Sequence, residues 1–114
     1  MVESFLQTEK QTAKKAVVFF DRREINQIMA VYGMMVGKGE WRDYAMDGSP
    51  DRAIFSIFRH ASELPLYRIE KIPALARKQG AWRVLAPGGH ILKRGHDLPT
   101  VLKVFDKFRL RVVS

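Results

Sequence analysis

The second half of the chain is rich in basic residues, whose charged side chains could bind anions. Residues 58–114 hold twelve Lys or Arg against four Asp or Glu, whereas residues 1–57 hold eight of each. The whole formal net charge of +8 therefore lies in the second half. Guanidinium and ammonium groups at this density favour polyanions, namely RNA, DNA or an acidic protein surface.

Eight of these residues form the candidate nucleic-acid-binding set. Because side chains alternate along a strand, several of them are predicted to share one face of a sheet. Long basic side chains on that face would reach phosphates, while apolar atoms between them contact bases or a partner. The set comprises Arg68, Lys71, Arg77, Lys78, Arg83, His90, Lys93 and Arg94.

A predicted hairpin over residues 81–94 decides which of these residues point the same way. One side is expected to carry Trp82, Val84, Ala86, Ile91 and Lys93, and the other Arg83, Leu85, His90, Leu92 and Arg94. On the preceding strand, Tyr67 and Ile69 go with the first side, and Arg68 and Glu70 with the second. A basic rim at one end of the sheet is predicted from Lys71, Arg77, Lys78, Lys93 and His96.

Two other interpretations of the arginine-bearing face remain open. The arginines can form a solvated sheet face, partly neutralised by Glu70 and packed over Leu85 and Leu92. In addition, residues 52–59 are apolar on both sides of the strand, so something must cover the second face. The helix that begins at Asp21 or a second copy of the chain would provide that cover.

Catalytic and metal-binding patterns are absent from the sequence. The chain has no cysteine, and its three histidines fall in different predicted elements without a recognisable triad. Asp43, Asp47 and Asp51 span a turn and lack the pattern of a calcium loop. Gly88 and Gly89 precede a strand, not a helix, so they do not form a phosphate loop. We predict no enzymatic activity, no catalytic residue, no metal and no cofactor.

The elements that position the basic residues follow from periodicity and turn signals. Asp21 and Glu24 form a capping-box pattern before a helix that extends to Gly37, and Asp97 precedes a second helix that continues to about Lys107. Extended runs are predicted at residues 16–20, 40–46, 52–59, 66–71, 81–86, 90–94 and 108–113. The fold class is therefore α+β, a mostly antiparallel sheet of about five to seven strands with two helices packed on it.

Length and composition predict a single domain. Residues 16–114 are expected to form it, and residues 1–15 a mobile N-terminal leader. The N-terminus does not resemble a signal peptide, and no apolar run is long enough to span a membrane. A cytoplasmic location and no membrane partner are expected.

Several sequence blocks carry a family resemblance. They include Gly39-Glu40-Trp41-Arg42-Asp43-Tyr44-Ala45, Pro65-Leu66-Tyr67-Arg68-Ile69-Glu70-Lys71 and Ile91-Leu92-Lys93-Arg94-Gly95. In this order, over about residues 19 to 105, the chain resembles the uncharacterised alphaproteobacterial domain-of-unknown-function family 2794. The resemblance implies a bacterial cytoplasmic protein and brings no activity or site residue with it.

The function expected from the residues is a small non-enzymatic basic domain that binds nucleic acid or serves as a regulatory module. The alternative is a protein-interaction or homodimerisation module that binds an acidic protein partner. The candidate partners are therefore RNA or DNA, an acidic protein and a second copy of the chain.

Overall fold

The first element in the described part of the chain is a long helix. The computed structural model describes residues 16–60 and 64–107, so the predicted leader 1–15 and the predicted last strand 108–113 lie outside the described residues. Helix α2 spans Arg22–Gly37. The capping box is confirmed, because Asp21 accepts from the Glu24 N–H and the Glu24 carboxylate accepts from the Asp21 N–H, each at 2.8 Å.

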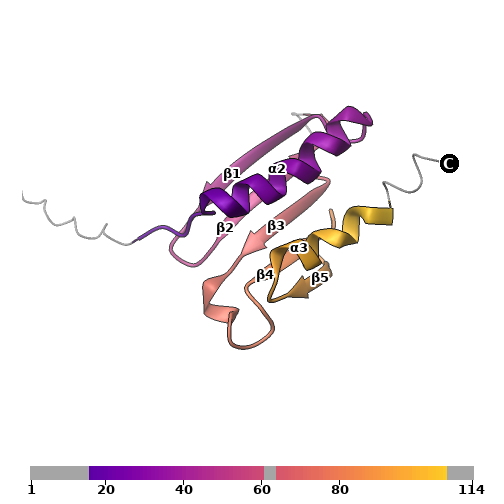
Figure 1. Ribbon diagram of the computed structural model, residues 1–114. Coiled ribbons are helices and arrows are strands. Elements are labelled where there is room, and N and C mark those ends of the chain that lie inside the picture. The colour runs from indigo at the N-terminus through magenta and orange to yellow at the C-terminus, as the bar shows by residue number, and fades with distance from the viewer. Residues whose placement is uncertain (1–15, 61–63, 108–114) are drawn as a thin grey trace, which may run out of the picture.

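In the described residues, five strands form one antiparallel sheet in which sequence order equals spatial order (Figure 1). They are β1 (Asp43–Gly48), β2 (Ala53–Phe58), β3 (Tyr67–Lys71), β4 (Trp82–Leu85) and β5 (Ile91–Gly95). The predicted α+β class with an antiparallel meander is confirmed. β1 and β5 form the two edges of the described sheet, so Asp43 and Asp47 of β1 lie at the opposite side of the sheet from Lys93 and Arg94 of β5.

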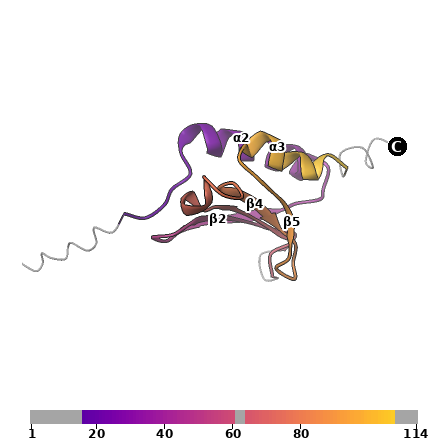
Figure 2. The ribbon, with the colours of Figure 1, turned by 90° about the horizontal axis from the view of Figure 1, so that it is seen from below.

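Both helices cover the same face of the sheet, which Figure 2 shows in profile. The second helix, α3, spans Leu98–Leu102 after the cap Asp97 and continues into the 3-10 turn η2, Lys103–Phe105. The core lies between the helices and the sheet, where strand residues such as Phe55 and Val84 are almost fully buried. The prediction that α3 covers the Trp82 side of the hairpin is confirmed, since α3 contacts β4 and β5 and Leu98 joins Trp82 in the core.

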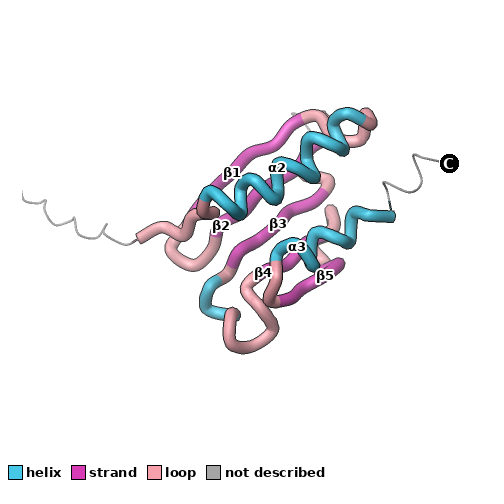
Figure 3. Tube along the Cα trace, viewed as in Figure 1, coloured by secondary structure: helices cyan, strands magenta, loops and turns pink. Residues whose placement is uncertain are grey.

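A compact connection joins β3 to β4 and is held against β5. It begins with the 3-10 turn η1, Pro73–Leu75, visible as the short helical segment beside a long loop in Figure 3. Gly80 has φ +102°, and a Cβ there would lie 2.1 Å from the carbonyl atoms of Gly95. Only glycine permits this backbone conformation and close approach, which place residues 76–80 beside the end of β5.

Three sequence predictions about local structure are wrong. Residues 16–20 form no strand, because they cross the end of β1, where the Val18 N–H donates to the Ser49 carbonyl at 2.9 Å. A bulge between Val84 and Leu85 pairs Leu85 with Ile91, so Ile91 joins the arginine-bearing face while Leu92 packs against the core. Helix α2 does not cover that face, since it lies on the same side as α3.

In the described parts of the chain, neither helix combines the length and apolarity that crossing a membrane requires.

Candidate functional site

The sheet face opposite the helices carries the arginine side chains, and we call it the open face. Strand pairing sets Glu70 of β3 beside Arg83 of β4, and Arg83 beside Arg94 of β5. The next row along the strands contains Arg68, Leu85 and Ile91. No described helix covers this face (Figure 2). It therefore presents basic side chains with apolar side chains between them.

A carboxylate at the centre of the open face binds two of the arginines. Glu70 is 4% exposed, and its Oε1 accepts from Arg83 Nε at 2.7 Å and from Arg52 Nη1 at 3.2 Å. A buried carboxylate needs such partners, because removal from water penalises the charged form. Arg52 also pairs with Asp51, at 3.4 Å between Nη2 and Oδ2, so the cluster holds two negative and two positive charges and is neutral.

Arg68 reaches the turn between β4 and β5. A Cβ placed on Gly89 would lie 3.9 Å from Arg68 Nη2, so the guanidinium sits beside the turn that carries exposed His90. Among the described residues, no carboxylate pairs with Arg68. Its charge remains available to a ligand at this end of the open face.

The edge formed by β5 adds exposed basic residues. Arg94 lies opposite Arg83 on the open face, whereas Lys93 lies opposite Val84 and so on the helix-bearing side, where it stays exposed at the β5 edge. Arg94 Nη1 donates a hydrogen bond to Gln79 Oε1, and His96 Nδ1 lies 3.1 Å from the Ala76 carbonyl oxygen. These contacts and the Gly80–Gly95 approach hold the loop with exposed Arg77 and Lys78 next to β5.

The sequence pattern of a family described as "Protein of unknown function (DUF2794)" matches residues 18–102 of the chain. The chain belongs to the DUF2794 family. The match contains α2, all five strands and α3, and so it includes each candidate site residue. No curated protein and no solved structure gives a significant match to the chain.

Seven of the eight candidate residues surround the β3–β5 half of this DUF2794 domain, and one does not. Lys71 lies on the helix-bearing face, opposite Trp82, and its Nζ donates to Glu24 Oε1 at 2.7 Å and to the Phe19 carbonyl at 2.8 Å. It is thus separate from the predicted rim. The remaining seven define what we call the basic surface: Arg68, Arg77, Lys78, Arg83, His90, Lys93 and Arg94.

Two contributors to the basic surface were missed by sequence reasoning. Arg52 shares Glu70 with Arg83, and Gln79 binds Arg94. Arg52 precedes β2 and is eighteen residues from Glu70, so only the pairing register of β2 with β3 reveals the contact. A polar, exposed loop residue such as Gln79 gives no sequence signal at all.

The acidic residues of the DUF2794 domain form no metal site in its described part. No group of three His, Cys, Asp or Glu side chains there is placed to hold a metal ion. Asp51 instead accepts a hydrogen bond from the Ser49 hydroxyl at 2.8 Å, and this bond lowers the pKa of Asp51 below its ordinary value. Asp43 and Asp47 lie on β1, at the edge opposite the basic surface.

Proposed function

We propose that this protein is a small non-enzymatic nucleic-acid-binding module that holds phosphates on the basic surface. The observation that carries the proposal is the gathering of seven basic residues from β3, β4, β5 and two loops around one half of the sheet. The single carboxylate among them, Glu70, is already bound to Arg83 and Arg52.

The chemistry of the basic surface fits a phosphate backbone better than a single small anion. Its cations are spread over three strands and the loop at residues 76–80, so a ligand with repeated charges contacts several at once. Arginine forks bind phosphate oxygens in pairs. Ile91, which is partly exposed on the open face, offers apolar contact to sugars or bases, whereas Leu85 beside it is buried.

The test is a titration of single-stranded RNA and of duplex DNA at low and moderate salt. The double variant Lys93→Glu, Arg94→Glu tests the contribution of β5 to binding. The double variant Arg77→Glu, Lys78→Glu tests the contribution of the loop between β3 and β4. Each lost phosphate contact should reduce the magnitude of the slope of log K against log salt by about 0.9 on duplex DNA. Each double variant removes two basic side chains, so its slope should be smaller in magnitude by up to about 1.8. We avoid Arg83 here because its reversal would leave Glu70 without its closest partner.

The matched control is the double variant Lys38→Glu, Arg42→Glu, which changes the net charge by the same amount as each test variant. Its two residues lie at the end of α2 and before β1, outside the basic surface. The proposal requires this control to keep the wild-type salt slope. Absence of binding to either nucleic acid at low salt would overturn it, as would equal losses in the control. Poly-glutamate is titrated in parallel: preference for it over RNA and DNA would favour the acidic-protein alternative.

A further inference from the structure

Strand β1 is an edge strand that the rest of the described chain leaves uncovered. All six of its residues are exposed, whereas β2 beside it is mostly buried. β1 pairs only with β2 in the described sheet, so its outer edge is open to another strand. An open edge of this kind accepts main-chain hydrogen bonds from an extended peptide.

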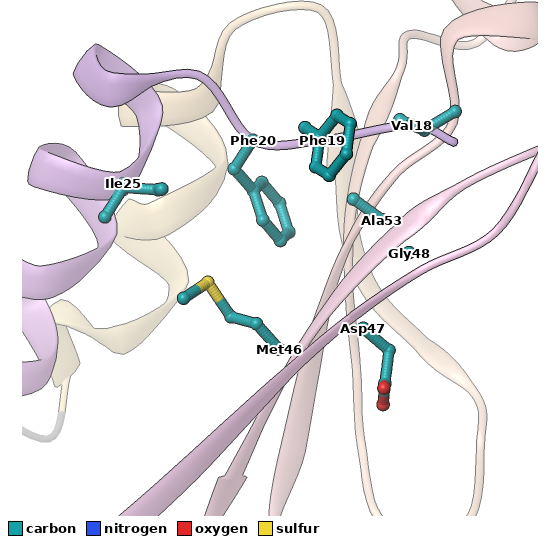
Figure 4. A pocket seen from close by; sticks show the side chains of 8 residues that line it. All are labelled: Val18, Phe19, Phe20, Ile25, Met46, Asp47, Gly48 and Ala53. Carbon is teal, nitrogen blue, oxygen red and sulfur yellow. The ribbon is translucent and has the colours of Figure 1, made fainter. Parts of the chain in front are cut away.

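The helix-bearing side of β1 is apolar. Tyr44 stacks on Phe55 with ring centroids 5.0 Å apart, yet Tyr44 and Met46 remain 38% and 44% exposed. Beside Met46 lies a pocket of about 270 Å³, which Figure 4 shows between β1, Ile25 of α2 and the N-terminal segment. Phe19 lines this pocket and is 72% exposed. Apolar side chains of a partner would find contacts here.

The opposite side of β1 is acidic. Asp43 and Asp47 share it, and in Figure 4 the Asp47 side chain points away from Met46 and the pocket. Among the described residues, no Lys or Arg pairs with either carboxylate. Asp43 instead accepts the Tyr44 N–H at 2.8 Å, a local bond that an incoming strand can replace.

The accessible edge has a defined end. A Cβ on Gly48 would lie 2.6 Å from both Val17 Cγ1 and the Val18 carbonyl oxygen. The N-terminal segment therefore lies directly against the end of β1, and an added strand has the residues from Asp43 to Asp47 to pair with.

We propose that β1 binds an extended segment of another protein in which basic and apolar residues alternate. Side chains of an added strand point alternately to the two sheet faces, so its basic residues would meet Asp43 and Asp47 while its apolar residues meet Tyr44 and Met46. The proposal is independent of the proposed function. It also runs against the net charge of +8, which by itself favours acidic partners.

A second copy of the chain fits this edge less well. Antiparallel pairing of two β1 strands centred on Ala45 would set Asp43 of each copy opposite Asp47 of the other. Like charges directly opposite each other destabilise a strand pair. The acidic side of β1 thus selects a basic strand over another β1.

The experiment measures binding of a labelled peptide, Val-Arg-Val-Arg-Val-Arg, to the full-length protein by fluorescence anisotropy. The comparison peptide is Val-Glu-Val-Glu-Val-Glu. We expect binding of the basic peptide only, weakened about fivefold or more by Asp43→Asn with Asp47→Asn. Asp51→Lys is the control, because it makes the same change in net charge from a turn outside β1.

Lys93→Glu with Arg94→Glu should leave peptide binding unchanged, which separates this site from the basic surface. The Asp43→Lys, Asp47→Lys variant should prefer the acidic peptide. The proposal is overturned if neither peptide binds, if both bind equally, or if the asparagine variant binds the basic peptide as tightly as the wild type. Equal weakening by Asp51→Lys would overturn it as well, because the effect would then come from net charge alone.

Discussion

Glu70→Gln removes the negative charge at the centre of the open face and barely changes the size of the side chain. In the wild type, Glu70 Oε1 accepts from Arg83 Nε at 2.7 Å and Arg52 Nη1 at 3.2 Å. The substitution should therefore have two opposite effects. It weakens the hydrogen bonds that stabilise the fold, and it releases the Arg83 guanidinium toward a polyanion, while Arg52 keeps its ion pair with Asp51.

The expected loss of stability follows from the exposure of the three side chains. Breaking a fully buried ion pair costs about 3–5 kcal/mol. Here the Glu70 side chain is 5% exposed, but those of Arg83 and Arg52 are 22% and 31% exposed, so water compensates part of the loss. Glutamine also keeps one acceptor oxygen. We expect the free energy of unfolding to fall by about 2 kcal/mol, measured by urea denaturation.

The expected gain in binding is read from the salt dependence. If the released Arg83 contacts phosphate, the slope of log K against log salt for duplex DNA should steepen by up to about 0.9. Glu24→Gln is the control, because it makes the same substitution in the Lys71–Glu24 ion pair on the helix-bearing face. That control should leave the slope unchanged.

Two results would refute this reasoning. An unchanged slope in Glu70→Gln, despite DNA binding by the wild type, would mean that Arg83 does not face the nucleic acid. An unchanged urea midpoint would mean that the ion pairs add nothing to stability. The first result would remove the centre of the open face from the proposed site, and the second would refute the expected contribution of Glu70 to stability.

Three further predictions concern the scaffold. Gly80→Ala should lower the free energy of unfolding by more than about 2 kcal/mol, because the φ of Gly80 is +102° and the new Cβ would overlap Gly95. Gly33→Ala should raise the free energy of unfolding by about 0.5–1 kcal/mol, because a Cβ on Gly33 would meet no atom within 4 Å and alanine favours the helix. Urea denaturation measures both changes. The Thr100 hydroxyl lowers the pKa of Asp97 below its ordinary 3.8, so this contact stabilises the fold above that pH and stops doing so as pH falls through the lowered value. The difference in urea midpoint between wild type and Thr100→Ala should therefore be constant at neutral pH and shrink at acidic pH below 3.8; a difference that persists to the lowest pH would contradict this account.

Local signals in the sequence predicted most of the fold. The Asp21–Glu24 capping box and the Asp97 cap depend on contacts three residues apart, so the sequence alone located both helix starts. The strand alternation that placed Arg68 and Glu70 together is equally local. The error at Ile91 and Leu92 came from the bulge, which shifts the alternation by one residue and has no signature in these side chains.

Contacts between distant residues account for the parts of the candidate site that could not be predicted. Alternation from Tyr67 and Ile69 puts Lys71 on the helix-bearing face, but its binding to Glu24, forty-seven residues away, depends on where α2 packs. Residues 16–20 have the composition of a strand, yet their position is set by contact with Gly48. Register and helix placement, not composition, decide both cases.

The placement of acidic and basic residues at opposite edges of the sheet makes the domain an electric dipole directed across its strands. Asp43 and Asp47 lie at one end of this dipole, and Lys93 and Arg94 at the other. The field of a polyanion exerts a torque on such a dipole before contact, within about 8 Å at physiological salt. The molecule would arrive with β5 leading, and β1 would face the solution, where it stays accessible to a second macromolecule.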